Sequence, residues 1–185
     1  WGRSLLAGGC WVSGSARSVP TGRFRVARAA SLYELEPGTD VEGNPFPWAE
    51  KLKGRVVYAT NVASKCGYTA SSYEEFRKLV NKDGLDLLLF PCRQFGGQEF
   101  KKDEEIKAFV QKQGLGGNPH VHVLTEGDVT GAKMQPAWKL MKELTSAPDP
   151  GWNFEGKFLV SKTGEVKRVP RGGSVEKMID ELLAE

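Results

Sequence analysis

Residues 31–185 of the 185-residue chain are predicted to form one α/β domain, with a central sheet covered by helices. Short apolar runs of strand length alternate with amphipathic stretches of helical length, which is the main evidence for this class. The hydrophobic fraction of 39% is enough to build a core, and the charged fraction of 26% is not that of a disordered chain. No apolar run approaches the roughly 18 residues of a membrane span, so we expect no stable membrane insertion.

The first half of this domain contains two predicted buried strands with a helix between them. Residues 55–62 (RVVYATNV) are mostly apolar and β-branched, as in a strand buried on both faces. A helix over about residues 71–82 would begin with a capping box formed by Ser71 and Glu74. Residues 86–90 form the second strand, which Pro91 ends.

Helix signals continue in the second half. Asp103 is predicted to N-cap a helix with one apolar face, and Pro136 suits the first turn of the next helix. We place Leu144 on the apolar face of that second helix. The remaining predicted elements are a strand over residues 120–124, a hairpin formed by residues 157–160 and 165–169, and a final helix over residues 175–183.

The first thirty residues differ in composition from the rest. Residues 1–30 hold five arginines, four serines, no lysine and no acidic residue, whereas residues 31–185 carry 21 basic and 23 acidic side chains. An Arg-rich, Ser-rich, acid-free segment is typical of a transit peptide, which predicts a mitochondrial or plastid protein. A disordered basic tail on a cytoplasmic protein is the alternative. The net charge of +3 is too small to indicate nucleic-acid binding.

Cysteine and histidine usage argues against disulfide and metal frameworks. The three cysteines, Cys10, Cys66 and Cys92, include no C-x-x-C pair, so we expect neither a disulfide scaffold nor a structural zinc site. His120 and His122 would share one face of a strand by alternation. With no further ligand cluster nearby, we expect them to be hydrogen-bonded or solvent-edge residues and expect no metal.

Cys66 lies where chemistry is expected in an open α/β sheet, between a strand end and a helix start. The positive end of the helix dipole and the neighbouring Lys65 would both favour the reactive thiolate. Gly67 permits a tight turn that keeps the sulfur accessible. The alternative is a buried cysteine that acts as a small hydrophobic residue.

Three motifs in one order now make a family resemblance specific. Residues 61–69 (NVASKCGYT), residues 90–99 (FPCRQFGGQE) and the WNF of residues 152–154, followed by KFLV, resemble the three signatures of the glutathione peroxidase family. The resemblance covers about residues 31–185. It implies a thioredoxin-like fold with a central mixed β-sheet flanked by helices. It also implies reduction of hydroperoxides without a cofactor, with glutathione or thioredoxin as co-substrate.

The same resemblance implies a catalytic set made of Cys66, Gln98, Trp152 and Asn153. Their chemistry suits the reaction, because the amides of Gln98 and Asn153 and the indole of Trp152 carry N–H donors for a departing alkoxide. Taken singly, each has a plainer interpretation. Trp152 could be a core aromatic residue, Asn153 a turn residue and Gln98 a surface residue.

The chain departs from the family at the position of the usual resolving cysteine, which here is Gln111. Cys92 is the possible resolving residue that remains, although a buried packing thiol is its commoner role, and Cys10 would be removed with the presequence. We therefore expect an external thiol such as glutathione. Arg93 and the pair Lys101-Lys102 could attract an anionic donor, or simply form a solvated face.

The segment of residues 145–151 is short, which resembles the monomeric, phospholipid-hydroperoxide type of the family, whose open site admits bulky lipid peroxides. Two other functions compete with a peroxidase. Cys66 could pass its oxidation to a partner protein as a redox sensor or relay, or the domain could be a non-catalytic binding module. The presence of Gln98, Trp152 and Asn153 disfavours the binding module.

Overall fold

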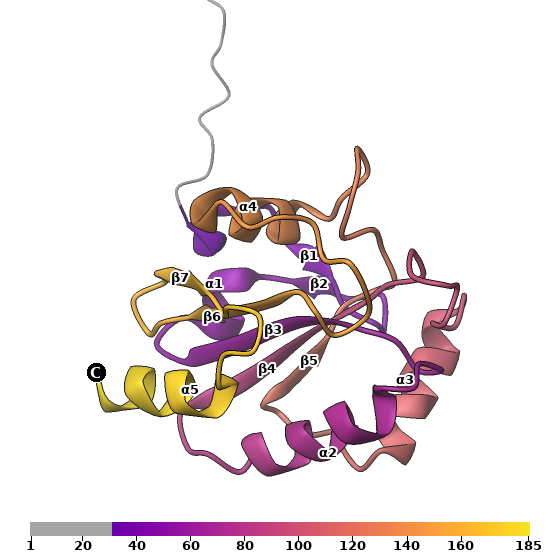
Figure 1. Cartoon of the computed structure of the whole chain (residues 1–185), viewed down its shortest axis with the longest axis horizontal. Helices are drawn as coiled ribbons and strands as arrows, with labels where there is room; N and C mark the ends of the chain where they lie inside the picture. Colours follow the sequence, from indigo (N-terminus) through magenta and orange to yellow (C-terminus); the bar gives the residue numbers. More distant parts are fainter. Residues whose placement is uncertain (1–30) are drawn as a thin grey trace, which may run out of the picture.

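The computed structural model describes residues 31–185, so the predicted presequence and Cys10 lie outside the described residues. A two-stranded ladder and a five-stranded sheet form, the latter in the order β5-β4-β3-β6-β7 (Figure 1). The central strand β3 (Val56–Val62) is parallel to β4 (Leu85–Pro91), which is parallel to β5 (Val121–Val123). On its other side, β3 pairs with an antiparallel strand. The mixed sheet predicted from the sequence is therefore confirmed.

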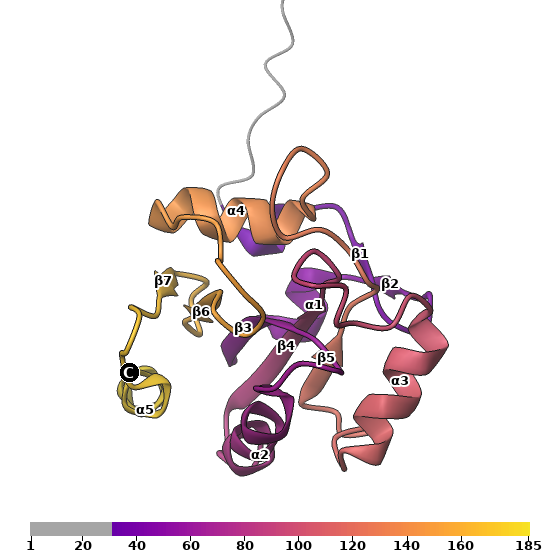
Figure 2. The same ribbon diagram turned by 45° about the vertical axis from the view of Figure 1, so that its right-hand side comes forward.

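The predicted hairpin supplies the other two strands, β6 (Lys157–Val160) and β7 (Val166–Arg168), both antiparallel to their neighbours. Helices cover both faces of the sheet. One face carries α2 (Thr69–Leu79), α3 (Asp103–Lys112) and α5 (Val175–Ala184) (Figures 1 and 2).

The opposite face is covered by α1 (Trp48–Leu52) and α4 (Pro136–Thr145). Every residue of β3 and β4 is buried, which agrees with the continuous apolar runs that predicted them. Alternate side chains of each strand enter different cores. Val56 and Tyr58 pack toward α2 and α5, whereas Val57 packs toward α4.

Three local expectations were wrong. The capping box at Ser71 does not form, because α2 begins two residues earlier and the Ser71 hydroxyl donates to the Tyr68 carbonyl. Asp103 is the first residue of α3 and not its cap, since its carboxylate accepts from the backbone N–H of Glu126 across the loop. Leu144 is 47% exposed, because it lies past the part of α4 that faces the sheet.

Residues 31–55 contain short elements that periodicity could not predict: η1 (Leu32–Glu34), β1 (Gly38–Thr39), β2 (Pro45–Phe46) and α1. The β1–β2 hairpin extends the edge of the sheet through an isolated bridge between Asp40 and Leu124. Within residues 31–185, no helix has both the length and the apolarity to cross a bilayer.

Candidate functional site

Cys66 lies in the loop between β3 and α2, with 9% of its surface exposed. The Thr69 hydroxyl organises this loop. It accepts a hydrogen bond from the Cys66 backbone N–H at 3.0 Å and donates one to the Ala63 carbonyl at 2.7 Å. Because both bonds share one oxygen, the turn that carries the thiol is fixed against the first residue of α2. The sulfur therefore belongs to a residue held at a helix N-terminus, as the spacing predicted.

A backbone contact joins the Cys66 loop to the second motif. The Lys65 N–H donates to the Gln98 carbonyl at 2.9 Å, which sets the two segments side by side. The exposed Lys65 side chain turns to Phe100, with its ammonium nitrogen 3.9 Å from the ring centroid. That cation–π contact holds the ammonium group against the Phe100 ring.

Gln98 is oriented by Asn153, a residue that is only 1% exposed. The Asn153 Nδ2 donates to the Gln98 Oε1 at 2.9 Å and to the Phe95 carbonyl at 3.4 Å. A backbone carbonyl can only accept, so the contact with Phe95 fixes which end of the Asn153 amide donates. Gln98 must then accept through its oxygen, which leaves both N–H groups of its Nε2 available to another molecule.

Trp152 is a partly exposed aromatic residue that directly precedes Asn153 of this amide pair. Its indole is 38% exposed and stacks at a tilt on Phe95, with 6.2 Å between the ring centroids. Gly96 lies close beneath, and a β-carbon there would meet the Trp152 ring at 3.4 Å. Since Gly96 also has a φ of +65°, any other residue would be strained at this point.

Asn61, on β3, holds the third motif in place and was not identified from the sequence. Its side chain donates to the Trp152 carbonyl at 3.1 Å and accepts from the Gly156 N–H at 2.9 Å, while its backbone carbonyl accepts from Phe154 at 2.9 Å. Phe154 has a φ of 64°, an uncommon left-handed conformation for an aromatic residue. A buried asparagine in an otherwise apolar strand was the signal in the sequence.

Cys92 directly follows β4, at the strand end where the sequence placed it, and it is fully buried. Its side chain packs in the core on the α4 face, whereas Cys66 packs in the core on the α2 face. Burial raises the pKa of the Cys92 thiol to about 11. The thiol also contacts the side-chain oxygen of Gln94 at 3.6 Å. Burial and a raised pKa both disfavour the thiolate of Cys92, and the two cysteines pack in different cores.

Around the amide pair, the charged residues that could attract an anionic thiol are exposed. Arg93, Lys101 and Lys102 all lie at the surface of the segment that carries Gln98.

Gln111, at the position of the usual resolving cysteine, is an exposed residue of α3. No second thiol in residues 31–185 therefore shares a core with Cys66.

The two histidines are hydrogen-bonded, as expected, and their shared partner is Asp86. The buried Asp86 carboxylate lies 2.8 Å from the Nε2 of His122, 3.1 Å from the Nδ1 of His120 and 2.7 Å from the Nε of Arg55. Between residues 31 and 185, no group of three or more His, Cys, Asp or Glu side chains could hold a metal ion. The cluster is an ionic network that ties β3, β4 and β5 together.

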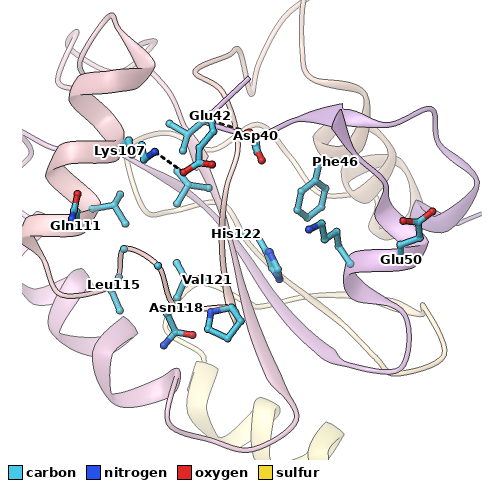
Figure 3. A pocket seen from close by; sticks show the side chains of 17 residues that line it. Asp40, Glu42, Phe46, Glu50, Lys107, Gln111, Leu115, Asn118, Val121 and His122 are labelled. Atoms are coloured by element: carbon cyan, nitrogen blue, oxygen red, sulfur yellow. Dashed lines mark hydrogen bonds and ion pairs between the residues drawn. The ribbon is translucent and has the colours of Figure 1, made fainter. Parts of the chain in front are cut away.

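A cavity of about 590 Å³ opens along the outer edge of β5, and Figure 3 shows His122 pointing into it beneath the ion pair of Glu42 and Lys107. Cys66, Gln98, Trp152 and Asn153 do not line it. Its mixed lining of acids, cations and apolar side chains carries no group suited to peroxide chemistry. The residues of the three motifs lie elsewhere, around the Cys66 loop and Gln98.

Comparisons with known proteins agree with this arrangement. Residues 32–142 match the family described as glutathione peroxidase. The chain is 38% identical over 167 residues to the glutathione peroxidase-like peroxiredoxin HYR1 of Saccharomyces cerevisiae, covering 84% of this chain and 98% of that protein. It is 42% identical to the mitochondrial glutathione peroxidase 1 of Chlamydomonas reinhardtii, over 72% of this chain and 70% of that one.

Solved structures agree as well. The apo crystal structure of Trgpx superposes with a TM-score of 0.57 at 27% identity, covering 84% of this chain and 95% of that chain. A thioredoxin-family thiol:disulfide interchange protein of Chlorobium tepidum, at 16% identity and a TM-score of 0.52, covers 80% of this chain and 92% of its own. That likeness extends to the fold alone, which is thioredoxin-like. With three motifs, the fold and these relatives in agreement, the chain belongs to the glutathione peroxidase family.

Proposed function

We propose that this chain is a thiol peroxidase that reduces hydrogen peroxide and organic or lipid hydroperoxides to water and alcohols, with Cys66 as the attacking residue and no cofactor. One observation carries the proposal. The loop of Cys66 is joined by a backbone hydrogen bond to Gln98, whose amide is oriented by Asn153 so that its N–H donors remain free. Donors aimed at developing negative charge are what this reaction needs.

In the oxidising step, the Cys66 thiolate attacks the outer oxygen of the hydroperoxide. The new S–O bond takes that oxygen with its hydrogen, the O–O bond breaks, and the sulfur becomes a sulfenic acid. The departing alkoxide carries the electron pair of the broken bond and takes a proton. The free N–H groups of Gln98 and the indole N–H of Trp152 are the groups that would stabilise this oxygen anion.

In the reducing step, an external thiol, glutathione or thioredoxin, attacks the sulfenic acid and releases water. A second thiol then displaces Cys66 from the mixed disulfide. Two features favour this route over an internal disulfide. Gln111 replaces the usual resolving cysteine, and Cys92 packs on the other face of the sheet with a raised pKa.

The short segment of residues 145–151 supports bulky hydroperoxides as substrates. Tyr68, 61% exposed, follows Cys66 in its loop, and Trp152, 38% exposed, precedes the Asn153 that contacts Gln98, so both can offer apolar surface to such a substrate. The segment after α4 is short, and we infer from it that the protein acts as a monomer. The relatives include mitochondrial and chloroplastic enzymes, and the arginine-rich residues 1–30 support import into one of these organelles.

Steady-state turnover of the full chain tests the proposal. With hydrogen peroxide or an organic hydroperoxide, and with glutathione or thioredoxin in parallel assays, Cys66→Ser should abolish consumption while the fold is retained. Cys92→Ser is the matched control and should keep most of the turnover. If Cys66→Ser retained more than a small fraction of the activity, the assignment would be wrong. If the wild type consumed only one equivalent with either reductant, a redox relay would replace the enzyme.

A further inference from the structure

Glu99 is a buried acid in the segment that contacts the Cys66 loop. It follows Gln98 directly, and it is 2% exposed. Its Oε1 accepts a hydrogen bond from the Phe100 N–H at 2.8 Å. Its Oε2 is buried and has no hydrogen-bond partner among residues 31–185. An ionised carboxylate would be costly at this position, because burial disfavours the charged form.

The neighbour of that carboxyl group is Ser64, two residues before Cys66. The Ser64 side chain is close enough to the Glu99 carboxyl to lower its pKa. Its buried hydroxyl nevertheless has no partner within hydrogen-bonding distance and angle among the described residues. The Lys65 N–H and the Gln98 carbonyl clamp the two segments together immediately alongside. Two buried polar groups without partners thus lie in segments that this hydrogen bond holds together. A proton on Glu99 would give the pair a donor in addition to the Ser64 O–H.

Among the charged groups nearby, Glu126 favours a neutral acid, because it adds negative charge from the segment after β5. The ammonium group of Lys65 lies over the ring of the next residue, Phe100, and a cation there acts in the opposite direction. On α2, the buried Tyr73 hydroxyl has no hydrogen-bond partner among the described residues. Burial first, and the charge of Glu126 in addition, raise the pKa of Glu99, although contacts with Ser64 and Phe100 oppose this.

We propose that Glu99 is a positioning residue for Cys66, which holds the loop of residues 63–66 in place as a neutral acid that donates its O–H to the Ser64 hydroxyl. The inference rests on the proposed function of Cys66 and adds a residue outside the four implied by the family motifs. When Glu99 loses its proton, the loop loses this donor, and a negative charge is buried in the segment that contacts the loop. Ionisation of Glu99 therefore loosens the loop that holds Cys66.

The test is the rate of Cys66 alkylation by iodoacetamide, followed by peptide mass spectrometry on the full chain from about pH 5 to about pH 9. Peroxide consumption is measured in the same samples. Glu99→Ala should slow alkylation about tenfold at acidic pH, and Glu99→Gln, which keeps a donor, should restore most of the loss. At alkaline pH the Glu99→Gln variant should overtake the wild type by about threefold, because it cannot ionise.

Glu104→Gln is the matched control, since Glu104 is an exposed acid in the first turn of α3, and its profile should parallel the wild type. A merely structural role for Glu99 would lower rates without changing the shape of the profile. Parallel profiles for wild type and Glu99→Gln would overturn the proposal, and this comparison stands even if Glu99→Ala fails to fold. Loss of the peroxidase function itself would appear separately, as alkylation without peroxide consumption.

Discussion

Two buried carboxyl groups, Asp86 and Glu99, lie at opposite ends of the parallel strands. They differ in the number of their hydrogen bonds and in the direction of their pKa shifts. Asp86, near the amino end of β4, accepts from Arg55 and contacts both histidines. Burial alone would raise the pKa of Asp86, but hydrogen bonds from His122 and Arg55 hold it below its usual range. Glu99, beyond the carboxyl end of β4, has one hydrogen bond and a raised pKa.

The amino end of the parallel strands holds a network that we expect to stabilise the fold, whereas the carboxyl end holds the proposed site. At the amino end, each oxygen of Asp86 is bonded and the network joins three strands. At the carboxyl end, the Ser64 hydroxyl, the Glu99 Oε2 and the Asn153 Oδ1 are buried without partners in the described residues. Unsatisfied polar groups cost stability, and three of those in the described residues belong to the motifs proposed to form the site.

The largest effect is expected at Asp86. Asp86→Asn removes the charge that Arg55 and the histidines face, and the free energy of unfolding should fall by about 3 kcal/mol at neutral pH. Because the folded pKa of Asp86 is lowered, its contribution is present above about pH 4, the unfolded value, and is lost as the pH falls through the folded value. Urea unfolding of both proteins at neutral and acidic pH measures this.

Asp83→Asn is the matched control for that substitution, because Asp83 is exposed and lies in the turn just before β4. It should change the free energy of unfolding by less than about 0.5 kcal/mol. An equal loss in Asp83→Asn, or a loss in Asp86→Asn that persists unchanged at acidic pH, would show that the ionic network does not stabilise this end of the sheet.

The second expected effect is on catalysis and concerns the proposed site at the carboxyl ends of the parallel strands. Asn153→Ala frees the Gln98 amide to rotate, and turnover should fall about thirtyfold. This is less than the roughly hundredfold or greater loss on removing an oriented donor, because Gln98 itself remains. Thermal unfolding should change much less than activity does. Asn81→Ala, which removes an exposed amide from the turn after α2, is the control and should leave turnover intact. Full activity in Asn153→Ala would mean that Gln98 needs no such orientation.

The smallest effect is a gain in stability from Glu99→Gln. Since the folded pKa of Glu99 is raised, the wild type loses stability as the pH rises from about 4.3, the unfolded value, through the folded value. The amide cannot ionise, so the variant should be more stable by about 1 kcal/mol at alkaline pH and by less at acidic pH. Melting curves across pH give the comparison. A variant that is less stable than wild type at alkaline pH would contradict a neutral Glu99.

Hydrophobic periodicity predicted the five main strands and four of the five α-helices, because each buries a regular face. It failed for residues 31–55, whose elements are two to five residues long and carry no period. It also misplaced the caps at Ser71 and Asp103, since loop contacts with Tyr68 and Glu126 decide where those helices begin.

The candidate site was predictable to a different extent. The order of three motifs placed Cys66, Gln98, Trp152 and Asn153 in one region. The contacts that organise them were not predictable, because Thr69 acts on Cys66 through a turn and Asn61 reaches the third motif across 91 residues of sequence. The separation of Cys66 and Cys92 onto different faces also required the structure, since adjacent strand ends alone would have permitted a bridge.

The most direct test of the central claim is mass spectrometry of the protein after one equivalent of hydroperoxide, without added thiol. We expect a sulfenic acid on Cys66, an unmodified Cys92, and conversion to a mixed disulfide on Cys66 when glutathione is then added. A quantitative disulfide between Cys66 and Cys92, together with loss of turnover in Cys92→Ser, would contradict it and make Cys92 the resolving residue.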